Sequence, residues 1–180
     1  MNTAVPPSTP SAQRAGASRS PDQRSADDLR RLRTEAPAPG ADSEKLYGLL
    51  LEASAWLRGK GLRQWNPVYP RERFPREIEA GHVWHWAFGG EPIATVTLLE
   101  RRPEYYPRGI WEDGLRAWYV CRFTVSRTLA GRRIGERLLE VLEADAVDKG
   151  VRVLRLDVVS SNPFLEDLRD GPRLRTLQDG

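Results

Sequence analysis

The segment that most constrains the fold of this chain runs from residue 120 to residue 139, VCRFTVSRTLAGRRIGERLL. It starts inside an apolar stretch, 118–125, that is typical of a buried strand, and then passes through a short polar turn. From Gly131 to Lys149 apolar residues recur at helical spacing, on one face formed by Ile134, Leu138, Leu139, Leu142 and Ala146. A strand that leads directly into an amphipathic helix predicts an α/β (α+β) fold in which helices pack on a sheet.

Other patterns predict further elements on both sides of this segment. Helical spacing predicts an amphipathic helix over 44–57, capped by Asp42 or Ser43, and a second, weaker helix over 71–80. The glycine pair at 89–90 is a hairpin signal. Four further segments have the composition of strands: 29–33, 82–88, 92–99 and 151–160. The expected order is strand, helix, helix, three strands, helix and strand.

Composition also divides the chain along its length. Residues 1–27 are rich in Pro, Ser, Ala, Arg and Gln, and such a segment buries too little apolar area to offset the entropy of ordering. We therefore predict a disordered tail over 1–27. One folded domain is expected over 28–165, followed by a divergent C-terminal segment over 166–180.

Charge and cysteine content limit the function classes that fit. The formal net charge is only +3, so nothing requires a nucleic acid partner, whereas small anionic ligands remain compatible. A single cysteine, Cys121, allows neither an intramolecular disulfide nor a cysteine-based metal site, and the only histidines are His82 and His85. We expect no metal, no membrane span and a reducing cytoplasm as the location.

The turn before the predicted helix has the chemistry of an anion site. The first N–H groups of a helix have no partners within it, and the helix dipole adds partial positive charge at the same end. Phosphates therefore dock at helix starts where the local side chains leave room. Here Gly131 and Gly135 provide room, and Arg132 and Arg133 add positive charge. Without the surrounding strand and helix, a plain turn and a helix-packing position would be the favoured interpretation of the two glycines; with them, CoA binding is favoured.

This segment resembles the acetyl-CoA loop of the GNAT superfamily of N-acetyltransferases, whose pattern is Gln/Arg-x-x-Gly-x-Gly/Ala. The pattern covers 130–135: its last glycine matches Gly135, Arg133 replaces its middle glycine, and Ala130 replaces its leading residue. Three other segments resemble a bacterial branch of the family: Trp56–Trp65, Gly90–Thr95 and Arg155–Pro163. The resemblance implies a central mixed, mostly antiparallel sheet flanked by helices, here lacking the last two strands.

The resemblance also implies a mechanism and a set of binding residues. Acetyl-CoA is the co-substrate, and a small-molecule or peptide amine attacks its thioester directly, without an acyl-enzyme. The pantetheine arm is expected along the fourth family strand and the pyrophosphate at the helix start. The implied acetyl-CoA residues are Phe123, Thr124, Val125, Gly131, Arg132, Arg133, Ile134, Gly135, Glu136 and Asn162.

The C-terminal sequence departs from the family. A family tyrosine commonly protonates the departing thiolate, but Leu168 and Arg169 occupy the tyrosine positions, so the general acid and base are unassigned. A positioned general acid is typically worth 10²–10⁴ in rate. Two hypotheses stay open: an impaired enzyme, and a non-catalytic acyl-CoA-binding or protein-interaction module. Absence of the last two strands would also leave 151–160 as an apolar edge, which predicts self-association.

Several single residues have two interpretations each. Cys121 is expected to be an inert, buried thiol. Trp65, Tyr105 and Tyr106 would either line an acceptor pocket or pack in the core. A catalytic base acting through water is one interpretation of two carboxylates, Glu100 and Glu104, and an ordinary surface position is the other.

Overall fold

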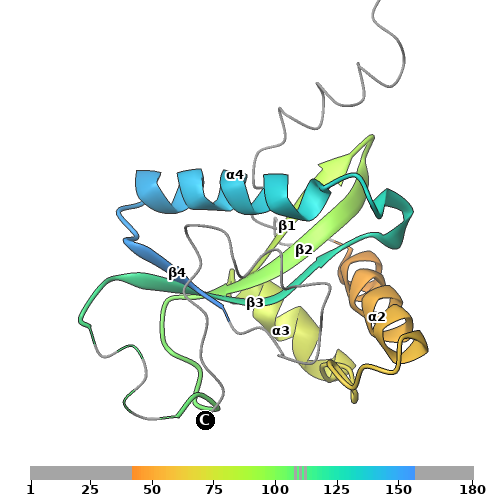
Figure 1. Ribbon diagram of the computed structural model, residues 1–180, viewed down its shortest axis with the longest axis horizontal. Coiled ribbons are helices and arrows are strands. Elements are labelled where there is room, and N and C mark those ends of the chain that lie inside the picture. Colours follow the sequence, from red (N-terminus) through yellow and green to blue (C-terminus); the bar gives the residue numbers. More distant parts are fainter. Residues whose placement is uncertain (1–41, 108, 110, 112, 157–180) are drawn as a thin grey trace, which may run out of the picture.

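The computed structural model describes residues 42–107, 109, 111 and 113–156 (Figure 1). In chain order the elements are α2 (Ser43–Gly59), the 3₁₀ turn η1 (Arg71–Arg73), α3 (Phe74–Glu79), β1 (Val83–Phe88), β2 (Glu91–Leu99), β3 (Ala117–Val125), the 3₁₀ turn η2 (Arg127–Leu129), α4 (Ile134–Asp148) and β4 (Val153–Arg155). The predicted tail 1–27, the strand 29–33, Asn162 and the segment 166–180 lie outside the described residues.

The four described strands form one sheet in the order β1-β2-β3-β4. β1 pairs with β2 and β2 with β3 in antiparallel fashion, whereas β3 pairs with β4 in parallel. The first pair is joined through Gly89 and Gly90, whose φ angles are 60° and 83°. Glycine adopts positive φ readily, and such angles match the twist of a two-residue hairpin. The predicted mixed, mostly antiparallel sheet is therefore confirmed.

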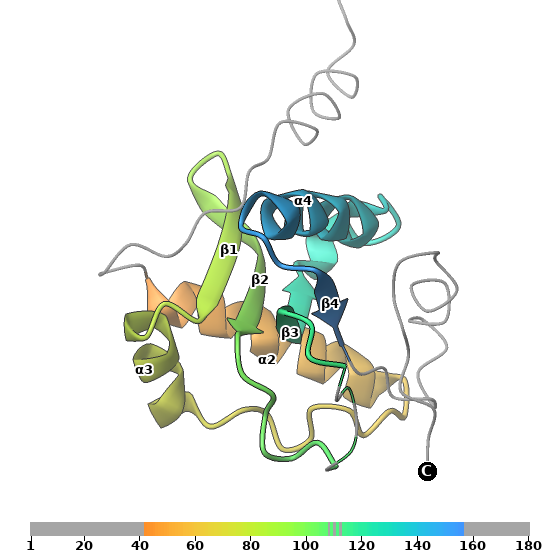
Figure 2. The same ribbon diagram turned by 90° about the vertical axis from the view of Figure 1, so that its left-hand side faces the viewer.

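Helices cover both faces of this sheet. α4 lies across one face, and α2 and α3 lie on the other (Figures 1 and 2). Leu138 and Leu142 of α4 pack with Trp86 and Val96 in one core cluster, while Leu46 and other α2 and α3 residues form a second cluster. None of the helices in the described part of the chain is long and apolar enough to cross a membrane.

The start of α2 follows its sequence signal. Asp42 is the N-cap, and its Oδ1 accepts a hydrogen bond of 3.2 Å from the backbone N–H of Lys45. A side-chain acceptor at this position satisfies one of the donors that the first helical turn leaves without a partner. The weaker second helix is shorter than predicted, because 71–73 form a 3₁₀ turn and the α-helix begins only at Phe74.

Two predicted elements have different limits in the structure. α4 begins at Ile134 instead of Gly131, because Gly131 and Arg133 have φ angles of 76° and 55° and cannot continue a right-handed helix. β4 begins at Val153 instead of Val151, because the N–H of Val151 bonds to the carbonyl of Ala146 at the end of α4, at 2.8 Å. β4 ends at Arg155, and residues 157–160 of the predicted strand lie outside the described range.

Candidate functional site

A groove of about 260 Å³ lies where β3 ends and α4 begins. One wall is β3 with the turn that follows it, and the other is the second half of α2 with Gln64 and Trp65. Seven of the predicted binding residues line this groove: Phe123, Thr124, Val125, Gly131, Arg133, Ile134 and Gly135. The structure thus gathers most of the predicted site in one place. Arg132 and Glu136 do not line the groove, and Asn162 is outside the described residues.

Among the described residues, one edge of β3 has no partner strand beside this groove. β3 pairs with β4 only over Ala117–Tyr119 within the described residues, so its second half has no described partner on that side. On the other side, Thr124 and Val125 pair with Thr95 and Ala94 of β2. Backbone N–H and C=O groups along an open strand edge can bind another extended chain.

The turn between β3 and α4 is held by its own geometry. The Ser126 side chain accepts a hydrogen bond from the N–H of Thr128, and η2 follows. Gly131 at φ 76° and Arg133 at φ 55° then reverse the chain into α4. Arg133 is the N-cap of α4 and forms no side-chain cap hydrogen bond. The first N–H groups of α4 are therefore not satisfied by this cap residue, as an anion site requires.

The two glycines of the turn serve different purposes. A Cβ on Gly131 would meet no atom within 4 Å, so its glycine is needed for the left-handed backbone. A Cβ on Gly135 would lie 3.9 Å from Phe123 Cε1 and Val125 Cγ2, an ordinary van der Waals separation. The packing of α4 against β3 therefore does not require glycine at 135, because an alanine would also fit there.

The charges at the start of α4 are partly neutralised within the protein. The Nε of Arg133 donates to Glu136 Oε2 at 2.9 Å, and a second bond joins Nη2 to the same carboxylate. This hydrogen bonding from Arg133 holds the pKa of Glu136 below its usual range. Arg133 therefore contributes less net positive charge to the groove than the sequence suggests.

Sequence reasoning missed Arg127, which also lines the groove. Its guanidinium lies over the ring of Trp56, 4.0 Å from the centroid, and its backbone N–H donates to Glu52 Oε1 at 3.1 Å. Its Nε is buried and has no hydrogen-bond partner among the described residues. The available signal was that Arg127 lies just after a buried strand, in the turn that leads to α4. Its contact with Trp56 could not be predicted, because Trp56 is far away in sequence.

A second cavity of about 480 Å³ adjoins the first along β3 and α2. Trp65 lines both cavities. The cavity's other lining residues are Leu50, Pro67, Val68, Tyr69, Pro70, Tyr105, Cys121 and Arg122. The pocket interpretation of Trp65 and Tyr105 thus fits the structure, whereas Tyr106 is 6% exposed and stacks in a cluster with Trp111 and Tyr119.

Of the remaining sequence candidates, Cys121 lines the second cavity and the others line neither cavity. Cys121 is buried, as expected, and its Sγ lies 3.3 Å from the Tyr105 hydroxyl. Glu100 is exposed and pairs with Arg116 at 3.3 Å. His82 Nδ1 lies 3.2 Å from Glu77 Oε2. Neither Glu100 nor Glu104 lines the groove or the second cavity.

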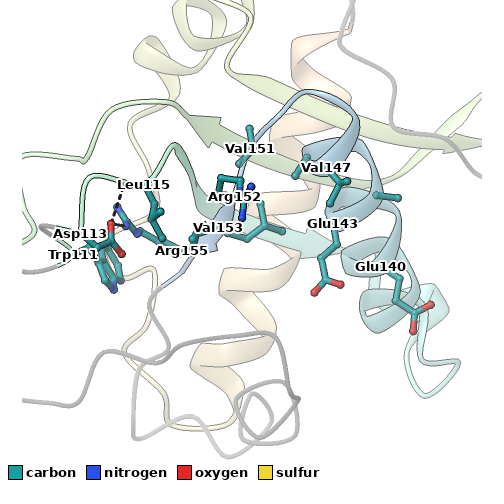
Figure 3. Close-up of a pocket in the computed structure, with 13 residues that line it drawn as sticks. Trp111, Asp113, Leu115, Glu140, Glu143, Val147, Val151, Arg152, Val153 and Arg155 are labelled. Atoms are coloured by element: carbon teal, nitrogen blue, oxygen red, sulfur yellow. Dashed lines mark hydrogen bonds and ion pairs between the residues drawn. The ribbon is translucent and has the colours of Figure 1, made fainter.

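A third cavity, of about 630 Å³, lies between α4 and β4 (Figure 3). At one end Arg155 forms an ion pair with Asp113 and donates to the Tyr119 hydroxyl at 2.9 Å. Burial opposes the charge on Arg155, but these two bonds outweigh it and raise its pKa. Glu140 and Glu143 project from α4 at the other end (Figure 3). None of the described residues that were predicted to bind acetyl-CoA lines this cavity.

Comparisons with known proteins agree on one family. The family model described as the acetyltransferase (GNAT) family matches residues 50–168. An uncharacterized N-acetyltransferase of Bacillus subtilis, YesJ, is 32% identical over 134 residues, which cover 72% of this chain and 74% of that protein.

Two solved structures show the same fold. A GNAT-family acetyltransferase from Listeria monocytogenes has a TM-score of 0.64 at 23% identity, covering 76% of this chain and 82% of its own. The PaiA N-acetyltransferase of Thermoplasma acidophilum, solved with coenzyme A, has a TM-score of 0.58 at 17% identity, covering 76% and 85%. Together with the family match, these findings show that the chain belongs to the GNAT family of acetyltransferases.

Proposed function

We propose that the chain binds acetyl-CoA in the groove at the end of β3 and transfers the acetyl group to a primary amine. The observation that carries this proposal is the joining of an open strand edge to a left-handed turn and a helix start within one groove. An extended polar arm and a phosphate group need these two features in this order. A relative of the same fold was solved with coenzyme A, which supports the same ligand here.

Each part of the groove suits one part of the proposed ligand. The backbone of Phe123–Val125 would hold the pantetheine amides, and the N–H groups of Gly131–Gly135 would hold the pyrophosphate. The buried, unpartnered Nε of Arg127 adds a donor that an anionic or carbonyl oxygen would satisfy. Arg132, Glu136 and Asn162 remain proposed contacts from the family resemblance alone.

Bound acetyl-CoA would supply a thioester, and the protein would orient it toward the amine. In the transfer, the amine nitrogen forms a bond to the acetyl carbon, the carbon–sulfur bond breaks, one proton leaves the nitrogen and one is taken up by sulfur. β3 has a bulge next to the groove, because Thr95 lies opposite Thr124 whereas Thr97 lies opposite Cys121. The extra residue of a bulge is left unpaired in the ladder, so its N–H can polarise the thioester carbonyl.

The alternative is an acyl-CoA-binding module without catalysis. One observation favours it: among the described residues that line the groove, none is a Tyr, His, Cys or Lys that could protonate the thiolate. Tyr69, Tyr105 and Cys121, which line the adjoining cavity, are candidates for that role. Acetyl-CoA binding without release of free CoA in the presence of any amine would establish this alternative.

Binding can be tested by filling the groove from its rim. Ala130 is exposed and lines the groove with a regular backbone, so Ala130→Trp should block the groove without disturbing the fold. Thr128 lies in the same turn, is exposed and does not line the groove, which makes Thr128→Trp the matched control. We expect calorimetry to show acetyl-CoA binding about tenfold or more weaker for Ala130→Trp, a loss of about 1.4 kcal/mol, and little changed for Thr128→Trp. Equal affinities in the two variants would place the ligand elsewhere.

A further inference from the structure

The residues that line the second cavity limit the kind of amine that it can bind. Its walls are apolar and aromatic, and Arg122 is the only charged residue among the described residues that line it. No described carboxylate lines the cavity, so a polycationic amine would find no counter-charge there. A cation enclosed by apolar walls attracts an anionic group more strongly than a solvent-exposed one does, because the local dielectric constant is low.

The bulge of β3 explains how Arg122 reaches this cavity. Neighbouring residues of a regular strand point to opposite faces, yet Cys121 and Arg122 both line the same cavity. Arg122 has a φ of 51° at the register shift of β3 against β2. A left-handed backbone at a non-glycine residue is unfavourable, and bulges near active sites commonly redirect a side chain. The strained backbone thus directs a cation toward the cavity beside the groove.

The guanidinium of Arg122 is held rigidly but is not fully used. Its Nε donates to Thr97 Oγ1 at 3.1 Å, its Nη2 lies 3.5 Å from Glu77 Oε2, and its plane covers the ring of Tyr69 at 4.0 Å. Nη2 is buried and makes no hydrogen bond within the described part of the chain. Nη1 also has no acceptor among the described residues, and it is not enclosed as Nη2 is.

Glu77 forms an ion pair with Arg122 and neutralises part of its charge, but it does not use all the donors of the guanidinium. Its carboxylate also accepts a hydrogen bond of 2.8 Å from the Tyr69 hydroxyl and lies 3.2 Å from His82 Nδ1. Burial, together with this bond to Glu77, raises the pKa of Tyr69, which therefore stays a donor. Glu77 thus contacts three side chains and does not line the cavity. Its contact with Nη2 holds the Arg122 guanidinium in position. A planar, pre-organised guanidinium of this kind is suited to bind a carboxylate.

We propose that the acceptor of this acetyltransferase is an amine that also carries a carboxylate, with an apolar or aromatic body, and that Arg122 binds the carboxylate. This inference rests on the proposed acetyl transfer, because the second cavity adjoins the groove through Trp65. Cys121 and Arg122 precede Phe123–Val125 on the same strand, so the amine of a bound acceptor lies close to the thioester end of the groove. Trp65, Tyr69 and Tyr105 would enclose the apolar body.

The test compares three acceptors that share one body: L-phenylalanine, its amide and phenethylamine, with spermidine as a polycation. Acceptor affinities are measured by calorimetry on the full chain with CoA present. Acetyl transfer is measured separately, from acetyl-CoA, by the release of free CoA, and each rate is divided by the fraction of the acceptor amine that is neutral at the assay pH. We expect phenylalanine to be favoured over its amide and over phenethylamine by about tenfold or more, as one charge-assisted contact provides. We expect the weakest binding for spermidine.

Two variants attribute this preference to Arg122. In Arg122→Gln, the affinity for phenylalanine should differ from that for phenethylamine by about threefold at most, which is less than a single charged hydrogen bond contributes. The affinities for phenethylamine and acetyl-CoA should stay as in the wild-type chain. Arg122→Lys keeps the charge but lacks the planar guanidinium, so its preference for phenylalanine should lie between those of the wild-type chain and Arg122→Gln. Circular dichroism checks that both variants are folded.

Failure of the inference is distinguishable from failure of the proposed function. A wild-type chain that binds all three phenylalanine-derived amines equally, or prefers spermidine, overturns the inference even if it transfers acetyl groups. Equal losses for phenylalanine and phenethylamine in Arg122→Gln do the same, because the residue would then act on the fold alone. Absence of acetyl-CoA binding overturns the proposed function instead, and the acceptor affinities of the wild-type chain still decide the carboxylate preference.

Discussion

Replacing Arg133 by glycine tests whether the turn before α4 carries backbone strain. Arg133 occupies the position where the family pattern has glycine, and its φ of 55° is left-handed. A left-handed conformation costs a residue with a side chain about 1–2 kcal/mol, which Arg133→Gly would recover. Glycine loses about 0.5–1 kcal/mol in chain entropy, and the exposed ion pair with Glu136 is worth about 0–1 kcal/mol. Together these figures give a change in the free energy of unfolding of between about −1 and +1.5 kcal/mol, centred on little change.

The adjacent residue provides the matched control. Arg132 is also exposed in the same turn, but its φ is not positive, so Arg132→Gly recovers no strain and should lower stability by about 0.5–1 kcal/mol. The entropy cost of glycine is common to both variants, so the difference between them is the recovered strain less the ion pair, about 1 kcal/mol in favour of Arg133→Gly. Urea denaturation of both variants measures it. Equal destabilisation by the two substitutions would refute the argument from strain.

The same variant bears on acetyl-CoA binding. Glycine at 133 removes a side chain from the groove, but it also leaves the Glu136 carboxylate without the cation that now neutralises it. The double variant Arg133→Gly, Glu136→Gln removes both effects and should bind acetyl-CoA at least as tightly as the wild-type chain. A tenfold weaker binding would show that Arg133 itself contacts a phosphate.

Two further predictions concern the β4 side of the sheet. Hydrogen bonding from Arg155 lowers the pKa of Asp113, so its stabilising effect should be present above the ordinary value of about 3.9 and be lost as the pH falls below it. Asp113→Asn should flatten this acid dependence in urea titrations from pH 6 to pH 3, and an unchanged slope would argue against the ion pair. The predicted self-association through the edge next to β4 is tested by light scattering after size-exclusion chromatography. A monomer at all concentrations would contradict that prediction.

Local signals were sufficient for those elements whose geometry is decided by neighbouring residues. Asp42 predicts the start of α2 because its side chain accepts a hydrogen bond from the N–H of Lys45, three residues later. The pair Gly89-Gly90 predicts the hairpin because both residues adopt positive φ. The start of α4 was wrong by three residues, because arginine gives no local sign that it will adopt a left-handed backbone.

The candidate site could be predicted only where it lies on one continuous segment. Residues 123–125 and 131–135 were identified because strand, turn and helix follow one another in the sequence. The stacking of Arg127 on Trp56 and the cavity around Arg122 depend on segments that meet only after folding. The bulge that directs Arg122 is a property of the register between β2 and β3, which the alternation within a single strand does not reveal.

Trp65 has a consequence for how the two proposed substrates would affect each other's binding. Its side chain belongs to the walls of both the groove and the second cavity, its φ is 60°, and its carbonyl accepts a hydrogen bond of 3.0 Å from Ser54. A ligand in either cavity therefore contacts a residue that shapes the other one. Any coupling between two binding sites is reciprocal: the factor by which the proposed acyl donor changes acceptor affinity equals the factor in the opposite direction. A shift of this shared tryptophan on binding one substrate would therefore change the affinity for the other in both directions alike.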